Sequence, residues 1–415
     1  MLRVLVLIIS ALALYVPPAI AQDNARARSA LAQDYDAIVA DIITITEIPA
    51  PPFGEERRAA HFADAFRSQG LKQVTTDPVG NVIGVYPDRD GEMDGPFLVV
   101  SAHLDTVFPE ETDVTVKRDG DRLLAPGIGD DSLGLAALLA WHRAMVAGNV
   151  QIDRPILFVG TVGEEGLGDL RGVRYLMTKG AYAGRIAGFI SVDGSHPERL
   201  VHAAVGSKRY EIVFNGPGGH SYGAFGIVNP MAAMAEAVRQ LYAIDLPADP
   251  RATYSASVVS GGRSVNTIPD RIALQVDMRS EDSEALDSLE SRFLTIVDNA
   301  VANENEARST SAGQISAEKN RIGDRPAGTT PVEHPLVQSA GTILTEAGYT
   351  VMLAASSTDS NIAMSMGIPA ITIGTGGGGG RAHALDEYLN VERSSFMTGL
   401  DAGLQIVIAA AGVAL

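Results

Sequence analysis

The chain has 415 residues, of which 46% are hydrophobic and 20% are charged, and its net charge is −18 from 50 acidic and 32 basic residues. This length exceeds what a single hydrophobic core usually supports, so we expect two domains. The acidic balance argues against nucleic acid or an anionic membrane surface as a partner. The sequence contains no cysteine, which excludes disulfides, thiolate nucleophiles and Cys-ligated zinc.

The N-terminus has the pattern of a signal peptide over residues 1–21. Arg3 precedes an apolar run over residues 4–16, and Ala19-Ile20-Ala21 offers small residues at a cleavage position. The apolar run is too short for a spanning helix, and an uncleaved N-terminal anchor is the alternative. We therefore expect a mature protein that begins at Gln22 and is periplasmic or secreted, without membrane association after cleavage.

Helices and strands alternate through the first half of the chain. Helices are expected over residues 23–50, 55–69, 132–147 and 174–178, and strands are expected just before His103, Glu164 and Asp193. This alternation predicts an α/β fold in which helices cover a mostly parallel sheet.

The pattern changes near Gly206 and resumes after residue 322. Strands over 209–215, 252–260, 270–279 and 313–321, with helices over 229–242 and 284–303, give the order βαββαβ. That order predicts a ferredoxin-like α+β domain inserted into the larger domain. A helix over 336–347 and strands over 350–353 and 370–374 then return to the first pattern. The expected division is 22–207 and 323–415 for the large domain and 208–322 for the insert.

Several apolar, strand-like runs end in residues that bind metals or transfer protons. These residues are His103 and Asp105, Glu164 and Glu165, Asp193, and His383 beyond the glycine loop 376–380. Because the carboxyl ends of strands in an open α/β sheet converge on one crevice, we expect these side chains to meet. Such a mixed set of imidazoles and carboxylates suits a zinc-type hydrolytic site.

Two of these pairs also suggest a division of roles. Asp105 shares one side of an extended segment with His103, so it can accept the second N–H of a metal-binding imidazole. Glu164 and Glu165 diverge at a strand end, so one can bind metal while the other takes a proton from water. A surface histidine and a solvated acidic turn are the plainer alternatives.

Three further motifs carry candidate functional groups. Asp130 and Asp131 lie in a glycine-bordered loop before a helix, where a carboxylate can bridge two metals or cap the helix. His220 follows two glycines in the insert and is a candidate donor to an oxyanion. Asn266 and Arg279 are candidate clamps for a substrate carboxylate or carbonyl, although Arg279 also fits a strand-end ion pair.

Taken together and in order, these motifs resemble the M20 family of co-catalytic zinc aminoacylases and peptidases. The matching segments cover nearly all of the mature chain and are Ser101 to Val107, Gly127 to Asp130, Gly163 to Gly166, Ser191 to Gly194, Gly218 to Ser221, Val265 to Pro269 with Asp277 to Arg279, and Ala382-His383. The resemblance implies a zinc-exopeptidase catalytic domain with an inserted lid or dimerisation domain.

The resemblance also implies a role for each residue. His103 and Asp193 would hold one divalent metal ion, Glu165 and His383 would hold the second, and Asp130 would bridge them, about 3.5–4 Å apart. The ions would be Zn²⁺, with Co²⁺ or Mn²⁺ as alternatives. Glu164 would be the general base, Asp105 would support His103, and His220 of a second subunit in a homodimer would stabilise the oxyanion. Asn266 and Arg279 would bind substrate.

Two departures from the family pattern bear on substrate and mechanism. Ser132 follows the Asp pair where the family usually has Lys or Arg, which leaves open which Asp is the bridge. Asp193 replaces the Glu of deacylases, and residues 356–361 resemble the tripeptidase-like branch, where Asp359 would receive a free amine. We therefore expect an exported dizinc exopeptidase for short peptides. An N-acyl amino acid amidohydrolase and an inactive metal- or peptide-binding protein are the alternatives.

Overall fold

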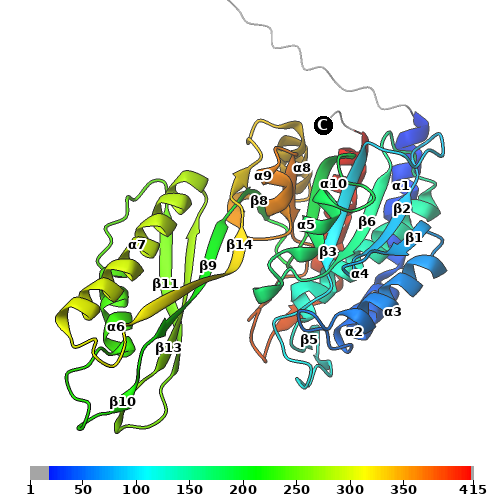
Figure 1. The fold of residues 1–415 in the computed structure, drawn as a ribbon. Helices are drawn as coiled ribbons and strands as arrows, with labels where there is room; N and C mark the ends of the chain where they lie inside the picture. The colour runs from blue at the N-terminus through cyan, green and yellow to red at the C-terminus, as the bar shows by residue number, and fades with distance from the viewer. Residues whose placement is uncertain (1–17, 413–415) are drawn as a thin grey trace, which may run out of the picture.

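The computed structural model describes residues 18–412 and has a large α/β domain beside a smaller α+β domain (Figure 1). Most of the predicted signal peptide therefore lies outside the described residues. Helix α1 (Pro18–Gln33) begins within the last residues of that segment. Beyond the predicted cleavage position, α1 is docked on the large domain, where Ala27 and Leu31 are buried.

A nine-stranded sheet forms the centre of the large domain. Its strand order is β1 (Lys72–Thr76), β2 (Val82–Tyr86), β6 (Ile156–Thr161), β3 (Phe97–His103), β7 (Ile186–Val192), β17 (Ala370–Ile373), β8 (Arg199–Ala204) and β15 (Gly328–Thr329), with β16 (Met352–Ser356) beside β8. The neighbours β6, β3, β7 and β17 are parallel, whereas β1, β2 and β15 pair antiparallel at the two edges. The predicted parallel arrangement is thus confirmed at the centre of the sheet.

Helices cover both faces of this sheet, because its central strands are apolar on both sides. In β3, Leu98 and Val100 face one core while Phe97 and Val99 face the other. The first core packs against α1, α2 (Tyr35–Thr46), α3 (Glu56–Ser68), α4 (Leu133–Gly148), α8 (Pro335–Glu346) and α10 (Arg393–Gly412). The second packs against α5 (Arg171–Thr178) and α9 (Ser360–Ser365).

Two helical segments differ from the sequence-based expectation. The helix expected over residues 23–50 is divided at Asp34, whose carboxylate accepts a 2.7 Å hydrogen bond from Arg143 of α4. The C-terminal helix α10 was not foreseen. Its length and composition would suit a membrane span, but 61% of its most apolar window is buried inside the protein, where it serves as a core helix.

The smaller domain is a four-stranded antiparallel sheet with two helices on one face. Its sheet order is β11 (Ala252–Gly261), β13 (Arg271–Ser280), β9 (Gly206–Asn215) and β14 (Ser316–Arg325), covered by α6 (Pro230–Leu241) and α7 (Ser283–Ala307). The chain order β9-α6-β11-β13-α7-β14 confirms the ferredoxin-like prediction. The short strands β10 (Gly219–His220) and β12 (Thr267–Ile268) pair at the end of this domain that lies away from the large sheet (Figure 1).

The two chain crossings between the domains are held together by one buried side chain. Asn361 of α9 donates from Nδ2 to the carbonyl of Val205, before β9, at 2.9 Å. The same amide donates to the carbonyl of Pro326, after β14, at 3.0 Å. The start and the end of the smaller domain are therefore fixed against the helix that precedes β17.

A close helix contact makes the packing of α10 testable. A Cβ atom at Gly403 would lie 2.3 Å from Cζ2 of the buried Trp141, whose Nε1 donates to the Leu400 carbonyl at 2.9 Å. We expect Gly403→Ala to lower the free energy of unfolding by about 1–3 kcal/mol through overpacking. Denaturant unfolding followed by the fluorescence of Trp141, the single tryptophan, measures this change.

Gly341 in α8 is the matched control, because a Cβ there would meet nothing within 4 Å. Gly341→Ala is expected to raise the free energy of unfolding by about 0.4–1 kcal/mol through the lower entropy of the unfolded chain. Equal unfolding midpoints for Gly403→Ala and the wild type would contradict the packing of α10 on α4.

Candidate metal centre and active site

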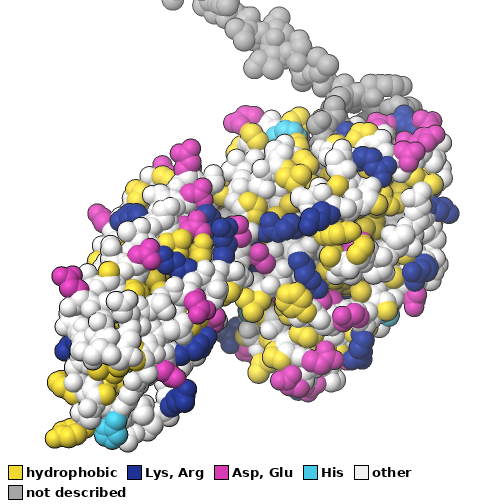
Figure 2. All heavy atoms as spheres, in the orientation of Figure 1, with side chains coloured by type: hydrophobic (Ala, Val, Ile, Leu, Met, Phe, Trp, Pro, Cys, Tyr) yellow, Lys and Arg dark blue, Asp and Glu magenta, His cyan; other side chains and the backbone are white. Residues whose placement is uncertain are grey.

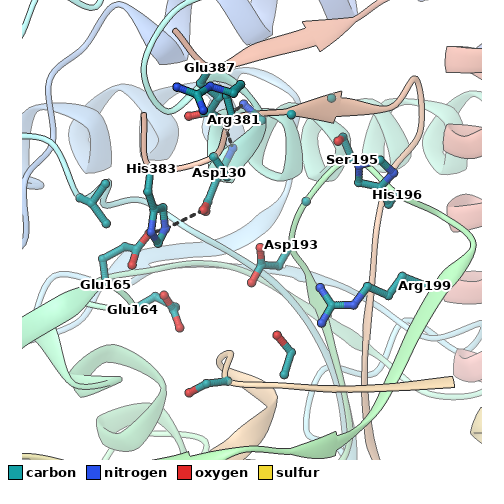
Figure 3. A pocket seen from close by; sticks show the side chains of 18 of the residues that line it. Asp130, Glu164, Glu165, Asp193, Ser195, His196, Arg199, Arg381, His383 and Glu387 are labelled. Carbon is teal, nitrogen blue, oxygen red and sulfur yellow. Dashed lines mark hydrogen bonds and ion pairs between the residues drawn. The ribbon is translucent and has the colours of Figure 1, made fainter. Parts of the chain in front are cut away.

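The Asp130 carboxylate lies between two imidazoles and is the centre of the site. Its Oδ1 is 2.9 Å from His103 Nε2, and its Oδ2 is 3.1 Å from His383 Nε2. Glu165 Oε1 is 2.9 Å from the same His383 nitrogen. Figure 3 shows Asp130, Glu165 and His383 turned toward one another, with Asp193 facing the same space.

The fold brings these residues together from distant parts of the sequence. His103 ends β3, Asp193 follows β7, and Glu164 and Glu165 follow β6, all at the carboxyl edge of parallel strands. His383 comes from the loop between β18 (Gly379–Gly380) and β19 (Tyr388–Asn390). These two strands belong to a small sheet with β4 (Lys117–Asp119) and β5 (Arg122–Leu124).

Crowding of buried carboxylates sets the electrostatics of the site. Burial, together with the charge of Asp130, raises the pKa of Asp193 to about 8. Hydrogen bonds to Asp130 and Glu165 raise the pKa of His383 to about 10. Burial disfavours the charged form of Asp130, but the hydrogen bonds from the two imidazoles outweigh it and hold the pKa of Asp130 below its ordinary value. The carboxylates at this edge of the sheet thus favour protonated or positively charged neighbours.

Three more buried carboxylates accept hydrogen bonds from the backbone of the site. Both oxygens of Asp105 accept hydrogen bonds, from the backbone N–H groups of Glu164 at 3.0 Å and Glu165 at 2.8 Å. His103 Nδ1 donates to the backbone carbonyl of Asp105 at 2.9 Å, while the Asp105 carboxylate lies 3.8 Å from this nitrogen. Asp105 therefore supports His103 chiefly through its carbonyl, and its carboxylate positions the two glutamates.

Asp131 and Glu387 complete this set of supporting carboxylates. Asp131 accepts from the backbone N–H of His103 at 3.0 Å and of Gly134 at 3.2 Å, so both of its oxygens bind backbone groups and it caps α4. Glu387 accepts from the N–H groups of Gly127, Gly129 and Asp130 at 2.8, 2.8 and 3.1 Å. Between the two candidates for a bridge, the geometry therefore favours Asp130.

Glu164 is buried beside the metal-binding candidates and is paired with an arginine of the smaller domain. Arg325, the last residue of β14, donates from Nη1 to Glu164 Oε1 at 3.0 Å and from Nη2 to the Glu164 carbonyl. Burial raises the pKa of Glu164 although Arg325 opposes this shift. Within the described residues, no hydrogen bond is made to Glu164 Oε2, and the side chain lines the cavity.

A cavity of about 620 Å³ opens over these residues, between the two domains. The predicted residues Asp130, Glu164, Glu165, Asp193 and His383 line it, as does Arg279. The Nε atom of Arg279 also donates to Asp277 at 2.6 Å. Both interpretations of Arg279, as an ion pair at a strand end and as a residue of the substrate cavity, therefore describe its position.

Three predicted site residues lie elsewhere in this chain. Asp359 is 1% exposed, accepts a hydrogen bond from the Thr161 hydroxyl at 2.5 Å and is outside the cavity lining, and its contact with a substrate amine stays a prediction. Asp359 directly precedes α9. His220 and Asn266 lie together at the β10–β12 end of the smaller domain, where Ser221 N–H donates to the Asn266 carbonyl.

Sequence reasoning missed Arg325 and Glu387, for which the chain offers little signal. Arg325 ends a strand in which seven of ten residues are charged or polar, so nothing distinguishes it from a surface arginine. Glu387 lies four positions after His383 in a loop with no helical periodicity. Only the folded chain brings Arg325 to Glu164 and Glu387 to the Asp130 loop.

The donor atoms fit a centre for two metal ions. Ligand atoms of His103, Asp130 and Asp193 lie within 4.8 Å of one another, and so do those of Asp130, Glu165 and His383. The two groups share Asp130, whose two oxygens face different histidines. Imidazole and carboxylate ligands are those that Zn²⁺ and related divalent ions use in hydrolytic sites. Two cations would also neutralise the repulsion among the buried acids.

Residues 99–409 match the family described as Peptidase family M20/M25/M40, and the chain belongs to this family. It is 26% identical over 224 residues to the N-acetylcysteine deacetylase of Bacillus subtilis, a match that covers 49% of this chain and 54% of that relative. The chain thus spans about half the length of this curated relative.

Solved structures show the same fold at lower identity. The aminopeptidase PepT of Bacillus cereus superposes with a TM-score of 0.70 at 19% identity, over 90% of this chain and 99% of that one. The YXEP protein of Bacillus subtilis, a dinuclear metal-binding peptidase of the M20 family, gives 0.62 at 16% identity, over 91% and 98%. These likenesses agree with the fold expected of a member of the M20 family.

Glu387 offers a test of how the site is supported. Glu387→Gln keeps the size of the side chain but places an amide NH₂ against backbone N–H groups that now donate to a carboxylate. We expect zinc affinity to fall by about 10- to 100-fold, because the loop that carries Asp130 loses its support. Competition with a chromophoric chelator measures this affinity. The exposed Glu346→Gln is the control, and equal affinities would contradict the role of Glu387.

Proposed function

We propose that this protein is an exported two-metal exopeptidase that hydrolyses short peptides. The observation that carries the proposal is the Asp130 carboxylate, which faces His103 with one oxygen and His383 with the other, beside the buried Glu164. His103 and Asp193 would hold one ion, and Glu165 and His383 the second. The signal-peptide pattern over residues 1–21 supports export, and Asp193 in place of Glu supports the aminopeptidase and dipeptidase branch.

The mechanism follows from the placement of Glu164. Bound metal ions would lower the pKa of a water molecule and polarise the scissile carbonyl. The Glu164 side chain lines the cavity and Arg325 holds its Oε1, so Oε2 would take the proton of the attacking water. The same carboxyl group then gives this proton to the leaving nitrogen. The raised pKa of Glu164 that burial causes suits a group that must both accept and release a proton.

Metal content and turnover of the protein that begins at Gln22 test this proposal. We expect two zinc-type ions per chain, and cleavage of di- and tripeptides with a free amine in preference to N-acetyl amino acids. Glu164→Gln should keep both ions and lower kcat by about 10²- to 10⁴-fold, because the proton acceptor is lost. Full turnover by Glu164→Gln with metal bound would refute the assignment of the base.

An N-acyl amino acid amidohydrolase is the second candidate. The similarity to N-acetylcysteine deacetylase favours it. Two bound ions with cleavage of acylated substrates alone would establish this second function. The absence of both metal and turnover would support a binding protein without catalysis.

We also infer a homodimer from the position of His220. His220 and Asn266 lie at the end of the smaller domain away from the large sheet, and His220 does not line its own chain's cavity (Figure 1). The exposed Tyr222, Phe225 and Val265 surround this tip and would be covered in an assembly. A second copy related by two-fold symmetry would bring each tip to the other cavity.

Mixing two inactive variants tests the shared site. Glu164→Gln lacks the base and His220→Ala lacks the proposed oxyanion donor, but a mixed dimer has one complete site. Random reassociation should therefore restore about a quarter of the wild-type activity. No recovery after mixing, with subunit exchange shown by mass, would mean that His220 does not act across an interface.

A further inference from the structure

Five arginines line the cavity outside the group of metal-binding candidates. They are Arg199, Arg209, Arg279, Arg325 and Arg381. Arg199 begins β8, while the next three come from β9, β13 and β14 of the smaller domain. Figure 2 shows basic side chains gathered along the junction of the two domains, and Figure 3 shows the Arg199 guanidinium directed into the pocket near Asp193.

Two of these arginines are neutralised by carboxylates of their own. Arg325 is paired with Glu164 at 3.0 Å. Arg381 is paired with Asp386 at 2.9 Å. Neither therefore adds net positive charge to the space that a substrate would enter.

The other three arginines have one carboxylate between them. Arg209 and Arg279 share Asp277, at 3.1 and 2.6 Å. Within the described residues, Arg199 makes no ion pair, and its Nη2 donates to the Ala355 carbonyl at 3.1 Å. Two of these three positive charges thus have no ion-pair partner of their own among the described residues. Crowding among these cations is reflected in Arg209, whose pKa burial and the charge of Arg325 lower.

We propose that the cavity selects substrates with two carboxylates, which Arg279 and Arg199 bind separately. Such a substrate is a short peptide or acyl amino acid whose carboxyl-terminal residue is acidic, as in Asp or Glu. The inference rests on the proposed function, because it takes this cavity as the hydrolytic site. Arg279 receives the terminal carboxylate, and Arg199 receives the carboxylate of the side chain.

The chemistry of arginine supports this assignment over a neutral or cationic substrate. A guanidinium presents paired N–H donors that match a carboxylate, and such charge-assisted pairs are stronger than neutral hydrogen bonds. An amide side chain of the same shape would offer one acceptor and place its NH₂ group against a cation. A lysine or arginine side chain in the same place would meet these positive charges.

Two pairs of substrates test the proposal, whether the protein is a peptidase or an amidohydrolase. The members of each pair have the same shape. The pairs are Ala-Glu with Ala-Gln, and N-acetylglutamate with N-acetylglutamine. For the metal-loaded wild type we expect kcat/KM to be about 10- to 100-fold higher for the acidic member of the hydrolysed pair. Arg199→Gln should bring this ratio close to one, and Arg199→Lys should keep part of it.

Arg381→Gln is the matched control, because Arg381 also lines the cavity but is neutralised by Asp386. Its ratio of acidic to amide substrate should remain that of the wild type. Arg199 has another conceivable role, the balancing of negative charge at Asp193. That role predicts that Arg199→Gln lowers kcat/KM equally for both members of a pair, and this outcome, or a wild-type ratio near one, would overturn the proposal.

A binding measurement separates failure of this inference from failure of the proposed function. Calorimetry on metal-loaded Glu164→Gln protein compares the affinities for N-acetylglutamate and N-acetylglutamine without turnover. Selective binding of the acid that Arg199→Gln abolishes would support the two-carboxylate site even if neither pair is hydrolysed. Equal affinities would refute the site whatever the activity of the enzyme.

Discussion

The edge of the large sheet that carries the candidate metal centre depends on one constraint, the burial of several carboxylates around Asp130. Desolvation disfavours each charged carboxylate, and the neighbouring acids disfavour it further, as the raised pKa of Asp193 shows. The imidazoles of His103 and His383 and the guanidinium of Arg325 offset only part of this cost. Divalent cations would offset the rest of this cost, so metal binding and the stability of this edge are expected to be linked.

The same residue type performs two different tasks here, and the neighbours of each carboxylate decide which one. Asp105, Asp131 and Glu387 accept hydrogen bonds from backbone N–H groups, so their lone pairs are used within the protein. Asp130 and Glu165 instead face imidazoles. The first set holds the end of β3 and the loops after β5 and β6 in place, which lets the second set remain crowded without moving apart.

The sequence predicts the parts of this arrangement that depend on local pattern. Apolar strand runs and the βαββαβ order predicted the two domains, because the spacing of apolar residues and the order of elements can be read directly from the sequence. The resemblance named Asp130 as the bridge, while Ser132 left the choice between Asp130 and Asp131 open because the two side chains have the same chemistry. In the structure Asp130 lies between two imidazoles. Arg325 and Glu387 reach the site through tertiary packing alone. The burial of Asp359 was not foreseen, because a motif gives the residue type but not the direction of its side chain.

The two domains bring opposite charges to the same cavity. The large domain provides the acids at the ends of its central strands, and the smaller domain provides Arg209, Arg279 and Arg325. Arg325 donates to Glu164, and Arg209 donates to the Gly166 carbonyl at 2.7 Å, so the smaller domain contacts the very loop that carries the candidate base. Any displacement of the smaller domain must therefore break hydrogen bonds to Glu164 or Gly166. The position of the proton acceptor and the position of the arginines that face the substrate are consequently set by the same contacts.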